Sequence, residues 1–247
     1  SIFGNQFLGG LYVSEADYTS ILNNTINADY SGISLSYGSY GTICNNFVFG
    51  ASEAISLYQF TNAEICNNYL EAGGTGVQMI DSDYFSIFNN YIINNTVGIN
   101  LESSHYSTIH DNQIYGNNYG INLEYPSNYF KIYNNQLFSN NLGLFASGGR
   151  HGLVYNNLFN NSRNVEAFGF PHHNNTWYIP LAFGQNIING TLLGGNYWSN
   201  YPGRDTNEDG IGDTDVPFNS SNNISGDSYP LVFPSQFTCG DLNNDNQ

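Results

Sequence analysis

Basic residues are scarce in this sequence. Its 247 residues include 4 Lys and Arg against 20 Asp and Glu, which gives a formal net charge of −16 at pH 7. Affinity for nucleic acids depends on Lys and Arg side chains that neutralise phosphates, so this charge argues against a nucleic-acid partner. It also argues against binding to anionic membrane surfaces. Long apolar runs are lacking too, and no stretch reaches the roughly 18 apolar residues that predict a transmembrane helix.

Asparagine, by contrast, is abundant and regularly placed. Pairs of Asn, in one case Asp-Asn, recur at steps of 22, 22, 22, 22, 23 and 22 residues, and the one additional residue lies near Pro126. Self-similarity at a fixed spacing is the signature of a repeat architecture. The pairs are Asn23-Asn24, Asn45-Asn46, Asn67-Asn68, Asn89-Asn90, Asp111-Asn112, Asn134-Asn135 and Asn156-Asn157.

Each repeat contains short segments in which apolar and polar residues alternate, as in Gly98-Ile99-Asn100-Leu101. This alternation is typical of half-buried β-strands. A unit of 22 residues with two or three short strands cannot bury its apolar face alone, but stacked units share a continuous core. The sequence therefore predicts an all-β fold, a parallel β-helix or solenoid. Equivalent residues of successive coils then lie on top of one another, about 4.8 Å apart, and form columns along the solenoid. In such columns Asn tolerates the left-handed backbone of a tight turn, and its side chain hydrogen-bonds the neighbours above and below.

Two of the three cysteines, Cys44 and Cys66, occupy the same repeat position in adjacent coils. Stacking of the coils brings their Cα atoms within the range that a disulfide requires. Two interpretations are open at this point. The cysteines form a staple between two coils, or they are reduced thiols in a column that continues with Phe88, His110 and Tyr133.

The regular repeats end after Asn157, and the chain divides into three predicted parts. Residues 1–200 form the β-helix, including irregular last coils. Residues 201–234 form a C-terminal cap with an acidic loop, and residues 235–247 form a linker with a short terminal motif.

The acidic loop of the cap reads DTNEDGIGD and begins at Asp205. Its oxygen donors at loop positions 1, 3, 5, 7 and 9, with Gly210 at the sharp turn, follow the spacing of a Ca²⁺ loop. Position 12 is Val216 in place of a bidentate Glu, so Asp215 or Asp227 would supply the missing oxygens. We predict a structural Ca²⁺ ion here, with a solvated acidic turn as the alternative. The predicted ligands are Asp205, Asn207, Asp209, the carbonyl of Ile211, and Asp213.

The last nine residues, Cys239 to Gln247, read CGDLNNDNQ and repeat the oxygen pattern at positions 1, 3 and 5. They resemble the opening calcium loop of a dockerin module. The resemblance implies a cohesin-type partner that binds through this truncated module. Asn246 stands where the dockerin loop has glycine, which puts ion binding by this fragment in doubt.

Three motifs carry a further resemblance: GGNYWSNY over 194–201, the DTNEDGIGD loop, and DSYPL over 227–231. Together with the Asn-Asn coils they resemble the NosD-like, or carbohydrate-binding and sugar hydrolase (CASH), β-helix family of archaeal and bacterial surface proteins. Disaggregatase-like proteins, which act on cell-wall heteropolysaccharide, are similar. The resemblance implies a right-handed parallel β-helix, as the general rule for parallel connections also does. It further implies a secreted or cell-surface location and a polysaccharide partner.

Copper-maturation members of this family imply metal delivery. Cu(I) prefers the soft ligands Met and Cys, and this sequence has one Met and three Cys. The sequence therefore argues against the copper branch of the family.

Counting from the Asn pairs places Glu102 and Glu124 at one position of two adjacent coils, facing outward. Two carboxylates one coil apart approximate the separation in a retaining glycosidase, where one of them acts as the acid. A second column places Asp83 next to His105. The alternative is that the stacked carboxylates are solvated or bridged by a cation. The catalytic candidates are Glu102, Glu124 and His105, and the substrate-binding candidates on this face are Asp83, Asn100 and Asn122.

A rival cluster lies on the strands before the Asn pairs. Lys131, the single lysine of the chain, is predicted beside Thr108, and His110 beside Tyr133. A polysaccharide lyase uses Lys, His and Tyr to neutralise a uronate and remove its C5 proton. His110, Lys131 and Tyr133 are therefore further substrate-binding candidates, and the alternative is an aromatic ladder with one solubilising lysine.

Two classes of function follow from these patterns. The first is an extracellular β-helix that binds or processes cell-wall or matrix polysaccharide, as a hydrolase or lyase if it is an enzyme. The second is a noncatalytic cell-surface scaffold or adhesion module. The coils carry few loop insertions, and binding sites are commonly built from loops, which favours the second class. The family resemblance favours the first.

Overall fold

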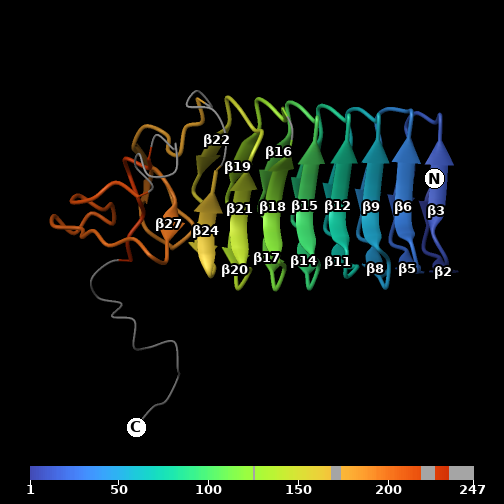
Figure 1. Ribbon diagram of the computed structural model, residues 1–247, viewed down its shortest axis with the longest axis horizontal. Coiled ribbons are helices and arrows are strands. Elements are labelled where there is room, and N and C mark those ends of the chain that lie inside the picture. The colour runs from blue at the N-terminus through green and yellow to red at the C-terminus, as the bar shows by residue number, and fades with distance from the viewer. Residues whose placement is uncertain (125, 168–173, 218–225, 234–247) are drawn as a thin grey trace, which may run out of the picture.

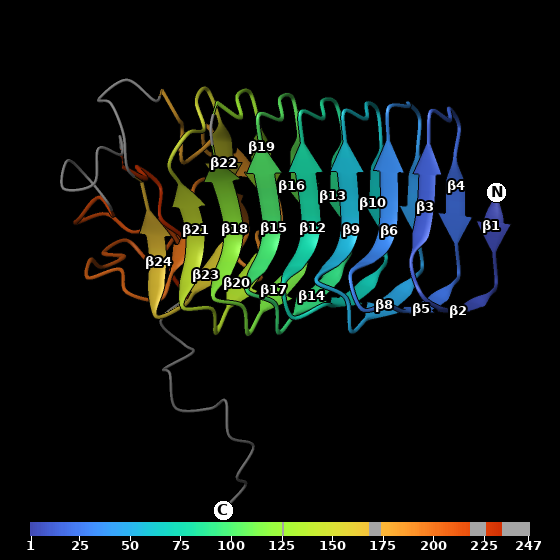
Figure 2. The ribbon, with the colours of Figure 1, turned by 45° about the vertical axis from the view of Figure 1, so that its right-hand side comes forward.

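Three parallel β-sheets wrap around one core in the computed structural model, which describes residues 1–124, 126–167, 174–217 and 226–233 (Figure 1). Each regular coil contributes one strand to each sheet, and successive coils stack along a single axis (Figure 2). The predicted parallel β-helix is confirmed, with 22-residue steps between most coils. No helix in these ranges is long and apolar enough to cross a membrane.

The first sheet, sheet A, has eight strands and the second, sheet B, has nine. Sheet A contains β1 (Ile2–Phe3), β4 (Ser20–Leu22), β7 (Thr42–Cys44), β10 (Glu64–Cys66), β13 (Ser86–Phe88), β16 (Thr108–His110), β19 (Lys131–Tyr133) and β22 (Leu153–Tyr155). Sheet B contains β2 (Gln6–Leu8), β5 (Thr25–Asn27), β8 (Phe47–Phe49), β11 (Tyr69–Glu71), β14 (Tyr91–Ile93), β17 (Gln113–Tyr115), β20 (Gln136–Phe138), β23 (Leu158–Asn160) and β27 (Tyr197–Trp198).

The third sheet, sheet C, has eight longer strands, and a small antiparallel pair lies outside the solenoid. Sheet C contains β3 (Leu11–Ser14), β6 (Ser31–Ser36), β9 (Glu53–Tyr58), β12 (Thr75–Ile80), β15 (Val97–Glu102), β18 (Tyr119–Glu124), β21 (Leu142–Ala146) and β24 (Arg163–Glu166). The antiparallel pair is β25 (Ala182–Phe183) and β26 (Leu192–Leu193).

Apolar columns from the three sheets fill the interior. In one coil, Ile87 of sheet A, Ile92 of sheet B and Leu101 of sheet C are all fully buried. Each stacks on the equivalent Ile or Leu of the next coil. Burial of one such side chain contributes roughly 1.5–3 kcal/mol, so the repeated apolar couplets explain why the coils stack.

The two residues of each Asn pair have different roles. The first residue of every pair has a positive φ, between 52° and 58°. Asn and Asp adopt this left-handed conformation more readily than most residues. It makes the tight turn between sheets A and B, and the second residue of the pair then points its side chain inward.

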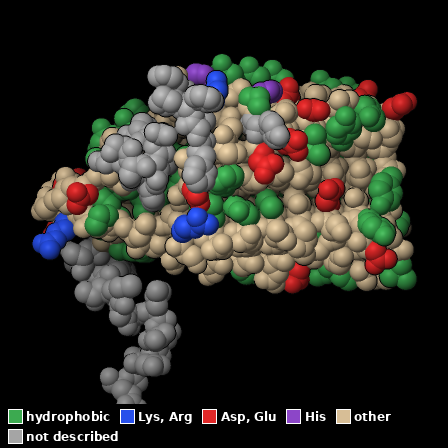
Figure 3. All heavy atoms as spheres, viewed as in Figure 1, with side chains coloured by type: hydrophobic (Ala, Val, Ile, Leu, Met, Phe, Trp, Pro, Cys, Tyr) green, Lys and Arg blue, Asp and Glu red, His purple; other side chains and the backbone are tan. Residues whose placement is uncertain are grey.

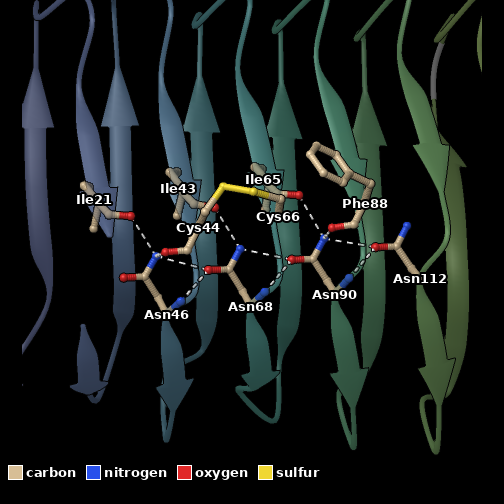
Figure 4. The surroundings of a disulfide bond; sticks show 10 residues. All are labelled: Ile21, Ile43, Cys44, Asn46, Ile65, Cys66, Asn68, Phe88, Asn90 and Asn112. Carbon is tan, nitrogen blue, oxygen red and sulfur yellow. Dashed lines mark hydrogen bonds between the residues drawn. A yellow bond between two sulfur atoms is a disulfide. The ribbon is translucent and has the colours of Figure 1, made fainter. Parts of the chain in front are cut away.

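The second residues of the pairs form a buried ladder of amides along the solenoid (Figure 4). The N and Nδ2 atoms of Asn68 donate to Oδ1 of Asn90, at 2.9 and 3.0 Å. Asn68 Nδ2 also donates to the carbonyl oxygen of Ile43, at 2.8 Å. The same pattern links Asn24, Asn46, Asn68, Asn90, Asn112, Asn135 and Asn157, and confirms the predicted hydrogen-bonded Asn columns.

Polar ladders also occupy the other two corners. Between sheets B and C the ladder consists of Asn95, Asn117, Asn140 and Asn161. Between sheets C and A, Ser82 N donates to Ser104 Oγ and Ser104 N donates to Ser127 Oγ, both at 3.2 Å. Since a buried backbone N–H must be paired, these side chains satisfy the turns at which each coil changes direction.

The main ladder continues beyond the regular repeats. Asn157 N and Nδ2 donate to Oδ1 of Asn196, at 3.1 and 2.9 Å, across 39 residues of chain. The next strand, β27, pairs with β23 and extends sheet B by one position. The GGNYWSNY segment is thus the last rung of the solenoid, and not a separate cap.

Asp227 ends this ladder. Its Oδ2 accepts hydrogen bonds from Asn196 N at 2.7 Å and from Trp198 Nε1 at 2.8 Å. A Cβ on Gly195 would collide with this carboxylate, so only glycine fits there. Burial raises the pKa of Asp227 to about 6, although these hydrogen bonds favour the charged form.

Cys44 and Cys66 form a disulfide between β7 and β10 (Figure 4). Their Cα atoms are 4.6 Å apart. Of the two interpretations that the sequence left open, the structure has the staple between adjacent coils. The cross-link closes a segment of 22 residues and restricts the unfolded chain.

Candidate functional site

The acidic pair lies on the outer face of sheet C, the face seen in Figure 3. Strands β15 and β18 pair in parallel with Glu102 opposite Glu124 and Asn100 opposite Asn122, as the repeat count predicts. Both Glu side chains are half-buried. Uncharged polar side chains and backbone cover much of this face, with several hydrophobic patches, scattered Asp and Glu and few Lys and Arg side chains (Figure 3).

Asn100 and Asn122 face away from the core but are 9% and 5% exposed. Asn100 Nδ2 donates to Gln78 Oε1 at 3.1 Å, and Asn122 Nδ2 donates to Glu124 Oε1 at 2.8 Å. Neither Oδ1 atom has a hydrogen-bond partner in the described chain. In this arrangement Asn122 orients Glu124, and a substrate reaches the carboxylates before it reaches the amides.

Asp83 and His105 form the neighbouring column, as predicted. Asp83 Oδ1 accepts a hydrogen bond from His105 N at 2.6 Å. His105 Nδ1 lies 3.1 Å from Asn128 N and therefore accepts, so the ring is neutral with its proton on Nε2. Each of the two side chains thus accepts a hydrogen bond from a backbone N–H of the next coil and stabilises that coil.

The side chains of the rival cluster are adjacent but already engaged. The ring of His110 stacks between Phe88 and Tyr133, with centroid distances of 5.1 and 4.9 Å. Its Nδ1 is 2.7 Å from Asp111 Oδ2 and its Nε2 is 3.3 Å from Ser86 Oγ. Both faces of the His110 ring are therefore covered, and both of its nitrogens lie within hydrogen-bond distance of a neighbouring side chain.

Lys131 and Tyr133 lie in the same strand of sheet A, β19. Lys131 is exposed and lies in register between Thr108 and Leu153. Burial, with the nearby Tyr155 and Asp111, raises the pKa of Tyr133. A raised pKa keeps the phenol protonated at neutral pH, so Tyr133 is a poor base. This geometry resembles the aromatic ladder more than a lyase site.

The acidic loop is held by hydrogen bonds of its own. Asp205 Oδ2 accepts from Gly210 N at 2.7 Å, and Asp209 Oδ1 accepts from Ile211 N at 2.9 Å. Hydrogen bonds from the Thr206 hydroxyl and N–H hold the pKa of Asp213 below its usual value. Within the described ranges, no group of three or more His, Cys, Asp or Glu side chains is arranged to hold a metal ion.

Asp227 does not belong to the acidic loop. The sequence suggested it as a supplementary calcium ligand, but it is 1% exposed and bonded to Asn196 and Trp198 at the end of the main ladder. Its Oδ2 accepts from Asn196 N and Trp198 Nε1, and its Oδ1 accepts from Tyr229 N at 3.1 Å, so both carboxylate oxygens are engaged at the end of the ladder. The terminal motif over 235–247, with its implied cohesin-type partner, lies outside the described residues.

A pocket that the sequence did not predict lies at the corner between sheets A and B. It has a volume of about 290 Å³ and is lined by Asp111, Gln113, Asn134, Gln136 and Asn156, and by residues 185–187. The only sequence signal for it is the repeat spacing that places Gln113 and Gln136 in one column. The return of residues 185–187 to this corner has no local signal.

Comparison with known proteins identifies the family. Residues 10–203 match the family described as periplasmic copper-binding protein (NosD). The chain belongs to this family. The NosD-like resemblance is thereby confirmed, and no curated protein matches the sequence.

Solved structures with a similar fold include alginate-modifying enzymes. A doubly substituted form of the periplasmic alginate epimerase AlgG has a TM-score of 0.62 and 19% identity, over 67% of this chain and 47% of that one. A second AlgG structure has a TM-score of 0.57 and 19% identity, over 63% of this chain and 45% of that one. The A-module of the mannuronan C-5 epimerase AlgE6 from Azotobacter vinelandii has a TM-score of 0.45 and 16% identity, over 70% of this chain and 53% of that one. The AlgG matches establish the fold, and this chain spans less than half of AlgG.

The copper named in the family description has no fitting Cu(I) site in the described part of this chain. Cu(I) prefers thiolate and thioether ligands. Cys44 and Cys66 are bonded to each other, and Met79 is fully buried in the core. The described Cys and Met residues of this chain therefore do not fit a Cu(I) ion.

Proposed function

We propose that this chain is an extracellular β-helix that binds cell-wall or matrix polysaccharide on the outer face of sheet C. The observation that carries the proposal is the registered pair Glu102 and Glu124, half-exposed and one coil apart, with Glu124 oriented by Asn122. Family membership and the similarity to AlgG, an alginate epimerase by name, support a carbohydrate ligand. The Cys44–Cys66 disulfide supports a location in an oxidising compartment.

The chemistry of this face favours a neutral stretch of polysaccharide. Glu102, Glu124 and Asp83 are acceptors when ionised, and they pair with the hydroxyl donors of a sugar. The acidic pair would repel the carboxylate of a uronate unless a cation bridged the uronate and the pair. If the bound chain is cleaved, the pair supports hydrolysis: strands about 4.8 Å apart place the carboxyl groups close to the roughly 5–5.5 Å of a retaining glycosidase.

Substitution of Glu102 tests this proposal. Loss of a hydrogen bond to a charged group costs about 1.5–3 kcal/mol, so we expect Glu102→Gln to raise the Kd for a bound polysaccharide by about 10- to 100-fold. Affinity is measured by calorimetry against neutral and uronate-containing polysaccharides, and cleavage by release of reducing ends. Glu64→Gln, on the exposed face of β10, removes the same charge elsewhere and is the matched control. Equal affinity of both variants would reject the site.

A noncatalytic scaffold is the second candidate function. The observation that favours it is the set of three polar ladders, one at each corner, which stabilise coils that carry few loops. Wild-type protein that binds no polysaccharide of the panel would support the scaffold in place of the carbohydrate site.

We also propose that Ca²⁺ binds the acidic loop. Its donors are hard oxygen ligands, which suit this ion. Asp205 and Asp209 each hold a backbone N–H with one carboxylate oxygen, and each carboxylate keeps further lone pairs for the ion. A ligand at 100 times its Kd adds about 2.7 kcal/mol of stability, so Ca²⁺ is expected to raise Tm by about 5 °C or more over EDTA.

The matched variants for the calcium test are Asp205→Asn and Glu208→Gln. Asp205 is at the first ligand position, whereas Glu208 is exposed and at none of them. The Tm rise is expected to disappear in the first variant and persist in the second, as followed by calorimetry. A wild-type Tm that is the same in Ca²⁺ and EDTA would leave the loop as a solvated turn.

A further inference from the structure

The pocket between sheets A and B has a rigid wall. Asn156 Oδ1 accepts a hydrogen bond from Ile187 N at 2.8 Å, and Asn156 Nδ2 donates to Asn134 Oδ1 at 2.7 Å. Asn186 is 4% exposed, and its Oδ1 accepts from Ile188 N and Gly190 N at 3.1 and 2.7 Å. Residues 185–187 are thus fixed against the turns of the last regular coils.

The floor of the pocket offers amide groups with unused hydrogen-bonding capacity. Gln113 of β17 and Gln136 of β20 are opposite each other in sheet B. Gln136 is exposed and makes no side-chain hydrogen bond to a described residue, and Gln113 makes one long contact of 3.4 Å from Nε2 to the Tyr91 hydroxyl. Gln185 uses its Nε2 to donate to Asn189, which leaves its Oε1 for a ligand.

The lining chemistry selects the class of ligand. Amides present both donors and acceptors, and each sugar hydroxyl also donates and accepts. Among the described residues that line the pocket, Asp111 is the one carboxylate and is paired with His110, and none is Lys or Arg, so an anion finds no counter-charge there. Ile187 adds an apolar surface for the C–H groups of a ring. A volume of about 290 Å³ lies at the lower end for small-molecule pockets.

We propose that this pocket binds one neutral pyranose ring, as a site separate from the acidic pair. It lies at the corner between sheets A and B, whereas Glu102 and Glu124 lie on the outer face of sheet C. The proposal does not rest on the proposed function of that face. Two sugar sites on one rigid solenoid would add avidity for a long or branched glycan without any new contact.

Titration with monosaccharides tests the pocket directly. Glucose, galactose, mannose and N-acetylglucosamine are each titrated into the wild-type chain, with calorimetry and saturation-transfer NMR as readouts. We expect at least one to bind with a Kd on the order of 1–10 mM, as few hydrogen bonds permit. Gln136→Ala and Gln185→Ala are each expected to weaken that binding about tenfold.

Gln6→Ala is the matched control. Gln6 is exposed on β2, in the same outward column of sheet B as Gln136 but at the opposite end of the solenoid. This variant is expected to bind the monosaccharide as the wild type does. Circular dichroism confirms that each variant is folded.

Two results would contradict the proposal that this pocket binds a sugar. One is the absence of saturable binding by all four sugars. The other is binding that Gln136→Ala and Gln185→Ala leave unchanged. Binding that is lost in Glu102→Gln but kept in Gln136→Ala would place the sugar on sheet C, which rejects the pocket and supports the proposed function. The two proposals therefore fail independently.

Discussion

Asn90→Ala is expected to lower the free energy of unfolding by about 4 kcal/mol. The substitution removes the acceptor of Asn68 N and the donor to the carbonyl oxygens of Ile65 and Phe88, and Ile65 and Asn68 lie in the buried interior. Each buried polar group left unpaired costs about 1–3 kcal/mol. The loss is larger than that from a surface change because one side chain serves the adjacent coils on both sides.

Urea unfolding of Asn90→Ala and Asn89→Gly measures this difference. Asn89 is the exposed first residue of the same pair, with a φ of 55° that glycine adopts without strain. Asn89→Gly is therefore expected to change stability by less than about 1 kcal/mol. Similar losses in the two variants would mean that the buried ladder contributes no more than the turn.

The second large effect is a dependence of stability on pH that Asp227 produces. Its pKa is raised from 3.8 to about 6 in the folded chain. Between these values the folded state binds a proton that the unfolded state does not, so lowering the pH favours folding. The contribution is complete below pH 4 and is lost as the pH rises through 6. A shift of about two pKa units corresponds to about 3 kcal/mol.

Comparison with Asp227→Asn isolates this effect from the other carboxylates. The variant keeps an acceptor for Asn196 N and Trp198 Nε1 but does not titrate. Urea unfolding at several pH values from 4 to 7 is expected to show wild-type stability rising toward pH 4, relative to the variant, by about 3 kcal/mol. Parallel pH profiles for the two proteins would show that Asp227 has the same pKa folded and unfolded.

The repeat spacing predicted lateral neighbours well. Counting in steps of 22 placed Glu102 beside Glu124, Cys44 beside Cys66 and, across the single inserted residue, His110 beside Tyr133. This works because in a parallel solenoid the register between coils depends only on the number of residues per coil. The spacing was silent on whether the cysteines are oxidised, since two stacked thiols satisfy the same count.

The end of the solenoid was not predictable in the same way. The ladder passes from Asn157 to Asn196 and ends on Asp227, and none of these separations is a multiple of the repeat. A signal was present: Asn196-Tyr197-Trp198 has the same order, Asn, large residue, aromatic residue, as Asn157-Leu158-Phe159, and their strands pair. Recognising the rung requires knowing that the intervening chain leaves the stack and returns.

The candidate site shows a similar limit. The column count put Asn100 and Asn122 on the outer face, but their near-complete burial depends on side-chain contacts with Gln78 and Glu124. Likewise, the tautomer of His105 follows from a hydrogen bond with Asn128 N, which no spacing specifies.

The direction of the amide ladder gives the solenoid an electrical polarity. From Asn24 to Asn196, each ladder amide turns its Nδ2 toward the C-terminal end and its Oδ1 toward the N-terminal end. Their dipoles are therefore parallel and add along the axis, as peptide dipoles do in an α-helix. The positive end of this row meets Asp227, the one carboxylate that is buried in the described chain. The carboxylate of Asp227 thus supplies the hydrogen-bond acceptor for Asn196 that a further coil would otherwise have to provide.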